Sequence, residues 1–193
     1  MSSSAKRFVL ESISFPSRQE VAFQYRVELE ENAAQHYTET LTFPEEIASF
    51  VSSPNAKPFL QSLHVMLGVS YWKAHCAPEI VIEAGYGLTE EQAEFWNTMY
   101  TRGLGEFFYI NKIDFRKLVQ FPIAQQGIRS IQLSTNAMKI LVPFGGGKDS
   151  VVTAETLKLA MPNFELIAVN PQPLQQKVAE KIGKPLIGIS RKV

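Results

Sequence analysis

Three consecutive glycines are followed by a lysine, an aspartate and a serine at residues 145–150, directly after a short apolar run. Glycine lacks Cβ, so its backbone can fold closely around phosphate oxygens and adopt positive φ. A helix that begins here would present unpaired N–H groups and the positive end of its dipole. Lys148 can add a positive charge, Ser150 can cap the helix or donate to phosphate, and Asp149 suits a Mg²⁺ ion between carboxylate and phosphate. The segment predicts a phosphate site with magnesium; a plain helix-capping turn is the alternative.

Two familiar glycine loops do not fit this segment. The Walker pattern has serine or threonine after its lysine, where this chain has Asp149, and the dinucleotide fingerprint has a final glycine where this chain has Ser150. The segment resembles instead the PP-loop of ATP pyrophosphatases, S-G-G-x-D-S, with Gly145 in place of the first serine. That difference removes one hydroxyl donor, so backbone N–H groups must do more of the binding. The resemblance implies that the loop binds ATP and Mg²⁺ and follows the first strand of an α/β sheet.

Asn170 follows a second apolar run, in the segment AVNPQP. Ligands of open parallel sheets bind at the carboxyl ends of strands, so we expect this segment to lie beside the glycine loop, where an adenosine could rest. A simple strand-ending turn is the alternative. The residues expected to bind the nucleotide are Phe144, Gly145, Gly146, Gly147, Lys148, Asp149, Ser150 and Asn170, with Asp149 also the metal ligand.

Two stretches upstream, SYWKAH and GLGEFFYIN, are rich in aromatic and ionisable side chains. They supply the candidate catalytic residues Lys73, His75 and Glu106. A lysine acts as a base only when burial or a nearby cation lowers its pKa, whereas a histidine titrates near neutral pH. Lys73 could instead bind a phosphate or carboxylate. Tyr71 and Asn111 are candidate substrate-binding residues. The alternatives are a core position for Tyr71, the solvated surface for Lys73, and a hydrogen-bonded or surface imidazole for His75.

The composition excludes several kinds of site. The chain has 193 residues, with 19 lysines and arginines against 19 aspartates and glutamates, which argues against a broad nucleic-acid or membrane surface. A single cysteine, Cys76, excludes a disulfide scaffold within the chain. His36 and His64 are expected to be structural, and three histidines on separate elements predict no metal cluster. Without a secretory h-region or an apolar run of ~20 residues, we expect a cytoplasmic protein; the oligomeric state is left open.

The elements that position these residues differ between the two parts of the chain. Apolar and polar residues alternate over 21–30 and again over 37–43, which predicts an antiparallel hairpin. An apolar stripe over 59–67 predicts a helix, and Thr89 opens another with a capping box. The buried face of that second helix is expected to carry Phe95, Trp96, Met99 and Tyr100. GVSYWKAHCAP and TRGLGEFFYINKID, with their glycines, are expected to be loops.

The pattern of apolar and polar residues changes after Lys139, where a short unbroken apolar run predicts a strand buried on both faces of a parallel sheet. We expect a helix from Ser150, a strand over 164–169, a helix from Pro173 and a third strand over 185–190. This β-α-β-α-β order predicts right-handed crossovers and a parallel sheet.

We therefore expect two domains. Residues 1–130 would form an α+β domain, and residues 131–193 would begin an α/β parallel-sheet domain of the PP-loop, HUP-like type. Three parallel strands with two helices bury little apolar surface and leave both outer edges open. For this reason we expect the chain to be the front part of a longer protein.

The segment VPFGGGKDS, preceded in order by LGVSYWKA and YTRGLGEFFYINKID, resembles a more particular family. This family is the MurL-type UDP-N-acetylmuramoyl-L-alanyl-L-glutamate epimerases of bacterial cell-wall synthesis, and the similarity runs from the first hairpin to Val193. It implies ATP-dependent inversion of the terminal L-glutamate of a UDP-muramoyl dipeptide to D-glutamate, with release of AMP and diphosphate. Two other functions stay open. One is another PP-loop enzyme that adenylates a nucleobase or carboxylate before adding sulfur or ammonia, and the other is a non-catalytic nucleotide-binding module.

Overall fold

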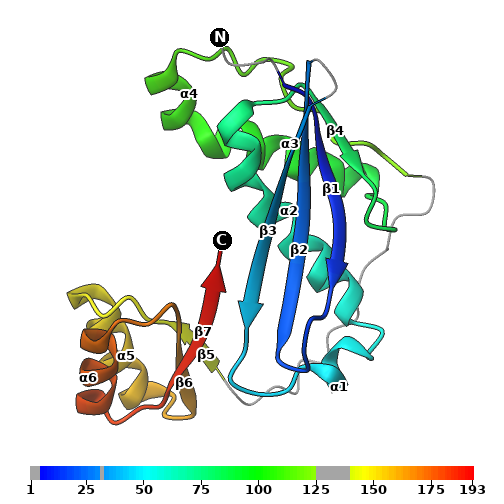
Figure 1. Ribbon diagram of the computed structural model, residues 1–193. Helices are drawn as coiled ribbons and strands as arrows, with labels where there is room; N and C mark the ends of the chain where they lie inside the picture. The colour runs from blue at the N-terminus through cyan, green and yellow to red at the C-terminus, as the bar shows by residue number, and fades with distance from the viewer. Residues whose placement is uncertain (1–4, 31–32, 125–139) are drawn as a thin grey trace.

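The computed structural model describes residues 5–30, 33–124 and 140–193 and shows one mixed seven-stranded sheet with helices (Figure 1). The strand order is β4-β1-β2-β3-β7-β6-β5. The strands are β1 (Ala5–Ser14), β2 (Glu20–Leu29), β3 (Ala34–Thr42), β4 (Glu79–Ile82), β5 (Ile140–Pro143), β6 (Phe164–Val169) and β7 (Leu186–Lys192). The helices are α1 (Ala48–Val51), α2 (Ala56–His75), α3 (Glu90–Thr101), the 3₁₀ helix η2 (Arg102–Leu104), α4 (Gly105–Asn111), α5 (Lys148–Ala160) and α6 (Pro173–Ile182).

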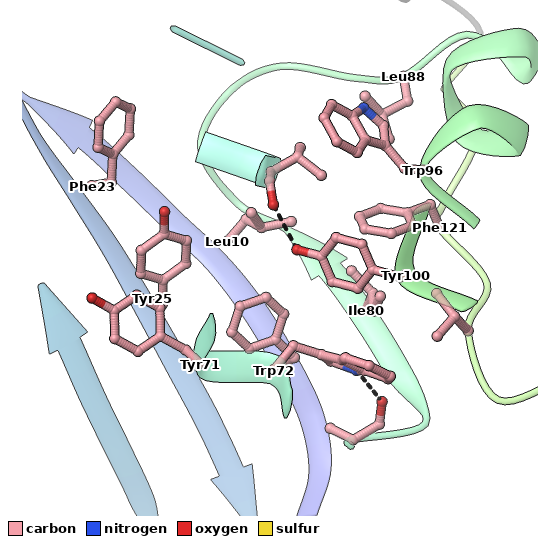
Figure 2. Packing of buried hydrophobic residues seen from close by; sticks show 14 of the residues in the cluster. Leu10, Phe23, Tyr25, Tyr71, Trp72, Ile80, Leu88, Trp96, Tyr100 and Phe121 are labelled. Atoms are coloured by element: carbon pink, nitrogen blue, oxygen red, sulfur yellow. Dashed lines mark hydrogen bonds between the residues drawn. The ribbon is translucent and has the colours of Figure 1, made fainter. Parts of the chain in front are cut away.

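The first part of the sheet confirms the expected hairpin. β2 pairs antiparallel with β3 from Glu20↔Thr42 to Glu28↔Ala34, β1 pairs antiparallel with β2, and β4 pairs parallel with β1. Because side chains alternate along a strand, one face of β1 and β2 carries Phe8, Leu10, Phe23 and Tyr25 into a buried core. Figure 2 shows side chains of α2 and α3 packed with these residues.

The structure corrects the expected loops on either side of α3. Residues 68–75 continue α2 to His75, and residues 105–111 form α4. Gly68 lies inside α2, at a point where bulky rings pack against the helix. A Cβ added there would lie 3.0 Å from Tyr25 Cε1, 3.2 Å from the Tyr100 hydroxyl and 3.3 Å from Phe8 Cζ. The glycine therefore serves packing rather than chain flexibility.

Gly68→Ala is expected to destabilise the protein by about 1–2 kcal/mol, although the same change in an open helix stabilises by about 1 kcal/mol. The new methyl group would press on rings that are completely buried and have little room to move. Urea unfolding measures the effect. Gly105→Ala in α4 is the matched control, because a Cβ there meets no atom within 4 Å. A Gly68→Ala variant that is more stable than the wild type would contradict the prediction, because it would show that the surrounding rings move to accept the methyl group.

The helix that follows residue 89 begins as expected. The Thr89 side chain accepts from the Gln92 backbone N–H at 3.3 Å, and the Gln92 side chain accepts from the Thr89 N–H at 3.0 Å, which completes a capping box. Trp96 and Tyr100 are buried as expected, but Phe95 is 53% exposed and lies outside the core. The buried face passes through Ala93, Trp96 and Tyr100, which follow the i, i+3, i+7 spacing of a helix.

The second part confirms the β-α-β-α-β order and the parallel pairing of β5 with β6 and of β6 with β7. The expectation that the first of these strands is buried on both faces is wrong: β5 is the last strand of the described sheet, and Leu141 is 51% exposed. The expectation of two open edges is also wrong, because β7 pairs antiparallel with β3 (Figure 1). The expected domain boundary at residue 130 lies outside the described residues.

Within the described ranges, no helix is both long enough and apolar enough to cross a lipid bilayer.

Candidate functional site

The glycine loop joins β5 to α5. Phe144 is buried in the small core of the parallel strands, and its N–H donates to the Ile167 carbonyl oxygen of β6 at 2.8 Å. The chain then turns through Gly146, which has a φ of +76°, and α5 begins at Lys148 with Gly147 as its N-cap residue. The loop therefore lies where the sequence places it, between the carboxyl end of a parallel strand and the N-terminus of a helix of 13 residues.

The fold requires only the middle glycine of the three. Gly146 has left-handed φ, and a Cβ there would lie 2.8 Å from Cγ of Gln175. A Cβ at Gly147 would meet no atom within 4 Å, and one at Gly145 would meet only the Ser150 hydroxyl oxygen, at 4.0 Å. Internal packing therefore does not explain why positions 145 and 147 lack side chains. The backbone at these two positions is therefore open to close approach by a ligand.

The charges and donors of the loop face solvent. Lys148 and Asp149 are exposed in the first turn of α5, and Gly147 provides no side-chain cap for the N–H groups of that turn. The Ser150 hydroxyl donates to the Gly147 carbonyl oxygen at 2.9 Å, so it braces the turn instead of capping the helix. Exposed N–H groups, a cation and a carboxylate are the groups that an ATP phosphate with Mg²⁺ requires.

Asn170 lies at the expected position, after β6, with a φ of +49°. Its side-chain amide is committed to β7: Nδ2 donates to the Arg191 carbonyl oxygen at 2.9 Å, and Oδ1 accepts from the Arg191 N–H at 2.7 Å. The Asn170 carbonyl oxygen accepts from the Gln172 side chain at 3.2 Å. In this arrangement Asn170 braces the strand end beside the glycine loop.

The second group of candidates gathers at the C-terminal end of α2. Tyr71 is buried, and its hydroxyl donates to a carboxylate oxygen of Glu39 at 3.0 Å. His75 Nε2 lies 3.0 Å from Gln35 Oε1 and 3.2 Å from the Tyr37 hydroxyl. The Gln35 oxygen also accepts from the Tyr37 hydroxyl at 2.6 Å. In the His75 tautomer that donates from Nε2 to this oxygen, Nδ1 keeps its lone pair.

Lys73 links this helix end to α4. Its Nζ lies 5.6 Å from the centroid of the Phe107 ring, in a cation–π contact. Glu106 and Asn111, on α4, are exposed, and the Asn111 side chain donates to the Phe107 carbonyl oxygen at 2.8 Å. Among the residues described, no hydrogen bond or salt bridge joins Lys73, His75 and Glu106 to one another.

Sequence reasoning missed Glu39 and Arg191. Glu39 is completely buried, and Arg191 of β7 binds it with two nitrogens: Nε lies 2.6 Å from Oε1 and Nη2 lies 3.1 Å from Oε2. The hydrogen bond to the negative Glu39 raises the pKa of Arg191. Burial is the main cause that raises the pKa of Tyr71, and the charge of Glu39 raises it further. The available signal was the alternation of β3, because Glu39 occupies an inward position between Tyr37 and Leu41.

The expectation that His64 is structural is confirmed, and the described residues contain no cluster of ligands for a metal ion. His64 lies completely buried in α2, where Nε2 donates to the Gln24 carbonyl oxygen at 3.1 Å and Nδ1 lies 3.2 Å from the Tyr86 hydroxyl. Burial lowers the pKa of His64 from 6.5 to about 4, so the ring is neutral.

Between pH 6.5 and 4, we expect the difference in pKa at His64 to remove about 3 kcal/mol from the free energy of unfolding. In this window the unfolded chain binds a proton at His64 and the folded chain does not, so acid favours unfolding. The contribution is complete above pH 6.5 and is lost as the pH falls towards 4.

Urea unfolding of the wild type and of His64→Gln over this pH range isolates the effect from that of the carboxylates. His36→Gln is the control, because the His36 side chain is 63% exposed. Parallel pH profiles for the wild type and His64→Gln would contradict the prediction.

Comparisons with known proteins identify the family of the chain and several relatives. The family model of the MurL N-terminal domain matches residues 1–193. A relative from Xanthomonas oryzae pv. oryzae is 36% identical over 132 residues, which cover 68% of this chain and 29% of the relative. One from Micromonospora sp. is 31% identical over 162 residues, which cover 82% of this chain and 36% of the relative. One from Salinispora tropica is 28% identical over 191 residues, which cover 96% of this chain and 41% of the relative. All three relatives are named UDP-N-acetyl-alpha-D-muramoyl-L-alanyl-L-glutamate epimerase.

The chain thus spans between 29% and 41% of the length of these curated relatives. No solved structure matches it. The resemblance carried by the glycine loop and the two upstream stretches is confirmed, because the family model covers every residue. The chain belongs to the MurL N-terminal domain family.

Proposed function

We propose that the chain provides the ATP-binding part of an epimerase that converts the terminal L-glutamate of UDP-N-acetylmuramoyl-L-alanyl-L-glutamate to D-glutamate in peptidoglycan precursor synthesis. The names of the relatives supply the substrate and the reaction class. The glycine loop carries the proposal of ATP, because two of its three glycines leave the backbone bare where the fold does not require it. In this proposal the loop N–H groups and Lys148 bind phosphate, and Asp149 binds Mg²⁺.

The chemistry of the reaction gives a reason for using ATP. Removing the α-proton beside a free carboxylate produces an enediolate with two negative charges. If a carboxylate oxygen first attacks the α-phosphorus of ATP, the bond to pyrophosphate breaks and a mixed anhydride with AMP forms. The anhydride bears less charge, so a general base can take the α-proton. Return of a proton to the opposite face, followed by attack of water on the anhydride, yields the D-glutamate product and AMP.

The two ionisable residues at the end of α2 suit different tasks. In the tautomer that donates from Nε2 to Gln35, His75 has a lone pair on Nδ1, and we propose that this atom accepts a proton. The ammonium group of Lys73 lies over the Phe107 ring, whose face attracts a positive charge. In this proposal Lys73 uses that charge to bind a phosphate or carboxylate. Glu106 is exposed on the neighbouring α4 and is proposed as an acid or base from that side.

Calorimetry and product analysis of the full-length protein that contains this chain test the proposal. We expect ATP to bind in the presence of Mg²⁺, and AMP, pyrophosphate and D-glutamate to form with the UDP-muramoyl dipeptide but not with tRNA. Formation of ADP, or turnover without nucleotide, would refute the adenylation step. AMP formed with tRNA would favour another PP-loop enzyme, and binding without any product would favour a nucleotide-binding module. A chain that binds no ATP would overturn all three.

A further inference from the structure

A buried carboxylate lies at the junction between the two parts of the sheet. Glu39 belongs to β3, is opposite Phe23 of β2 and has no exposed surface. A buried charge is tolerated only when it is paired and hydrogen-bonded. Both Glu39 oxygens are bound: Arg191 contacts each of them, and the Tyr71 hydroxyl donates to Oε2 at 3.0 Å. Two parallel N–H···O bonds of this kind define an orientation as well as a distance.

The strand that carries Arg191 belongs to both parts of the sheet. β7 pairs with β3 over only three residue pairs, Thr40↔Lys192, Leu41↔Arg191 and Thr42↔Ser190. On its other side it pairs in parallel with β6. So short a ladder has few backbone hydrogen bonds with which to set its register, and the ion pair between Glu39 and Arg191 supplies a specific side-chain contact at its centre.

From Arg191, a continuous series of hydrogen bonds leads to the glycine loop. Asn170 holds the Arg191 backbone with both atoms of its amide, and its own carbonyl oxygen accepts from the Gln172 side chain. The Gln172 N–H donates to Gln175 Oε1 at 2.6 Å, and Gln175 Nε2 donates to the Phe144 carbonyl oxygen at 3.1 Å. Phe144 is the residue directly before the three glycines.

In the other direction, the contacts lead to the end of α2. Tyr71, bound to Glu39, packs against Tyr37 with the rings tilted by 34° and their centroids 4.9 Å apart, and the Tyr37 hydroxyl lies 3.2 Å from His75 Nε2. Glu39 therefore lies on a path of contacts that joins the end of α2 to the glycine loop.

We propose that Glu39 is a positioning residue: its ion pair with Arg191 sets the register of β7 on β3 and so holds the glycine loop at one position relative to Tyr71 and His75. Its effect on turnover rests on the proposed function, but its effect on strand register does not. A displacement of about 1 Å between reacting groups can cost about 100-fold in rate, which makes such a position worth fixing.

A cysteine pair in the full chain measures the register independently of any activity. Thr42→Cys and Ser190→Cys would lie opposite each other, at the about 4.5–5.5 Å between Cα atoms that a disulfide can span. With oxidised glutathione, we expect rapid disulfide formation in this background and formation that is several-fold slower when Glu39→Gln is added. Glu79→Gln is the matched control, because Glu79 pairs with Arg7 at an exposed position, and it should change nothing.

Arg191→Lys provides a second variant if Glu39→Gln does not fold, since lysine keeps the charge opposite Glu39 but not the two-pronged contact. It should also slow disulfide formation. Equal rates in the parent pair, Glu39→Gln and Arg191→Lys would overturn the proposal, as would failure of the parent pair to cross-link.

Turnover provides the second readout. We expect Glu39→Gln to lower kcat for pyrophosphate release by about 100-fold with little change in the Kd for ATP, because the loop itself stays intact. The oxidised cysteine pair should restore kcat. Because a disulfide also stabilises a fold, the comparison is made where circular dichroism shows that the reduced Glu39→Gln variant is fully folded, so that a loss of stability alone would leave kcat unchanged. Unchanged kcat in a Glu39→Gln variant, or a loss that the cross-link does not restore, would contradict the positioning role. If the wild type releases no pyrophosphate, the proposed function fails. The cross-linking rates still test whether Glu39 sets the register of β7 on β3.

Discussion

Asp149→Ala is expected to lower the rate of pyrophosphate release by about 10²- to 10⁴-fold, because it removes the carboxylate proposed to hold Mg²⁺ at the glycine loop. Asp149 is exposed in the first turn of α5, next to Lys148 and the open backbone of Gly147. A carboxylate close to phosphate repels it unless a cation lies between them, so its presence here favours a metal-dependent transfer over simple phosphate binding. Pyrophosphate release with the UDP-muramoyl dipeptide measures the effect.

The fold should tolerate this substitution. A carboxylate in the first turn of a helix stabilises it by about 0.3–1 kcal/mol through the helix dipole, so Asp149→Ala should lose no more than that in urea unfolding. Glu155→Ala is the control: Glu155 is an acid on the same helix whose carboxylate lies 3.2 Å from Lys158 Nζ, and its removal should leave pyrophosphate release unchanged. Equal rates in the wild type and Asp149→Ala would refute the magnesium role of Asp149.

Trp72→Ala is expected to lower the free energy of unfolding by about 3–5 kcal/mol, the range typical of a large buried aromatic residue. Trp72 is completely buried in α2, with its ring centroid 5.4 Å from that of Tyr100 and 6.2 Å from that of Phe108 (Figure 2). Its Nε1–H donates to the Ala77 carbonyl oxygen at 2.9 Å, which ties the end of α2 to the segment that leads into β4. The substitution therefore removes packing around three helices and a buried hydrogen bond together.

Urea unfolding followed by the fluorescence of the remaining tryptophan, Trp96, measures this loss. Trp72→Phe keeps an aromatic ring and should recover much of the stability, the remainder reflecting the hydrogen bond to Ala77. Tyr109→Ala is the control on α4, because Tyr109 is 86% exposed and its removal should cost less than about 0.5 kcal/mol. A loss below about 1 kcal/mol for Trp72→Ala would show that the cavity collapses and that this core is not closely packed.

Features set by neighbouring residues could be read from the sequence. The two-residue alternation of β2 and β3 predicted their pairing, and the spacing of Thr89 and Gln92 predicted a capping box that the structure contains. The three glycines predicted a turn between a strand and a helix, and this turn is found at Gly146. Each of these depends on contacts within a few residues or on the periodicity of one element, which local chemistry is sufficient to determine.

Features that depend on distant contacts were predicted wrongly or not at all. Gly68 suggested a break in α2, but the helix continues, and the glycine leaves the space that Tyr25 and Tyr100 occupy. An apolar run suggested that β5 is covered on both faces, yet the run does not say whether other elements pack over each face, and Leu141 is exposed.

By itself, the sequence determined the local elements, the glycine turn and the family; the tertiary structure alone decided how the two parts of the sheet meet. Glu39 and Arg191 are separated by 152 positions in the chain, and neither has a local partner that would reveal the pair. An acid at an inward position of a strand signals only that some buried partner must exist. Which partner it is depends on β7 pairing with β3, and that pairing brings together segments whose patterns carry no information about each other.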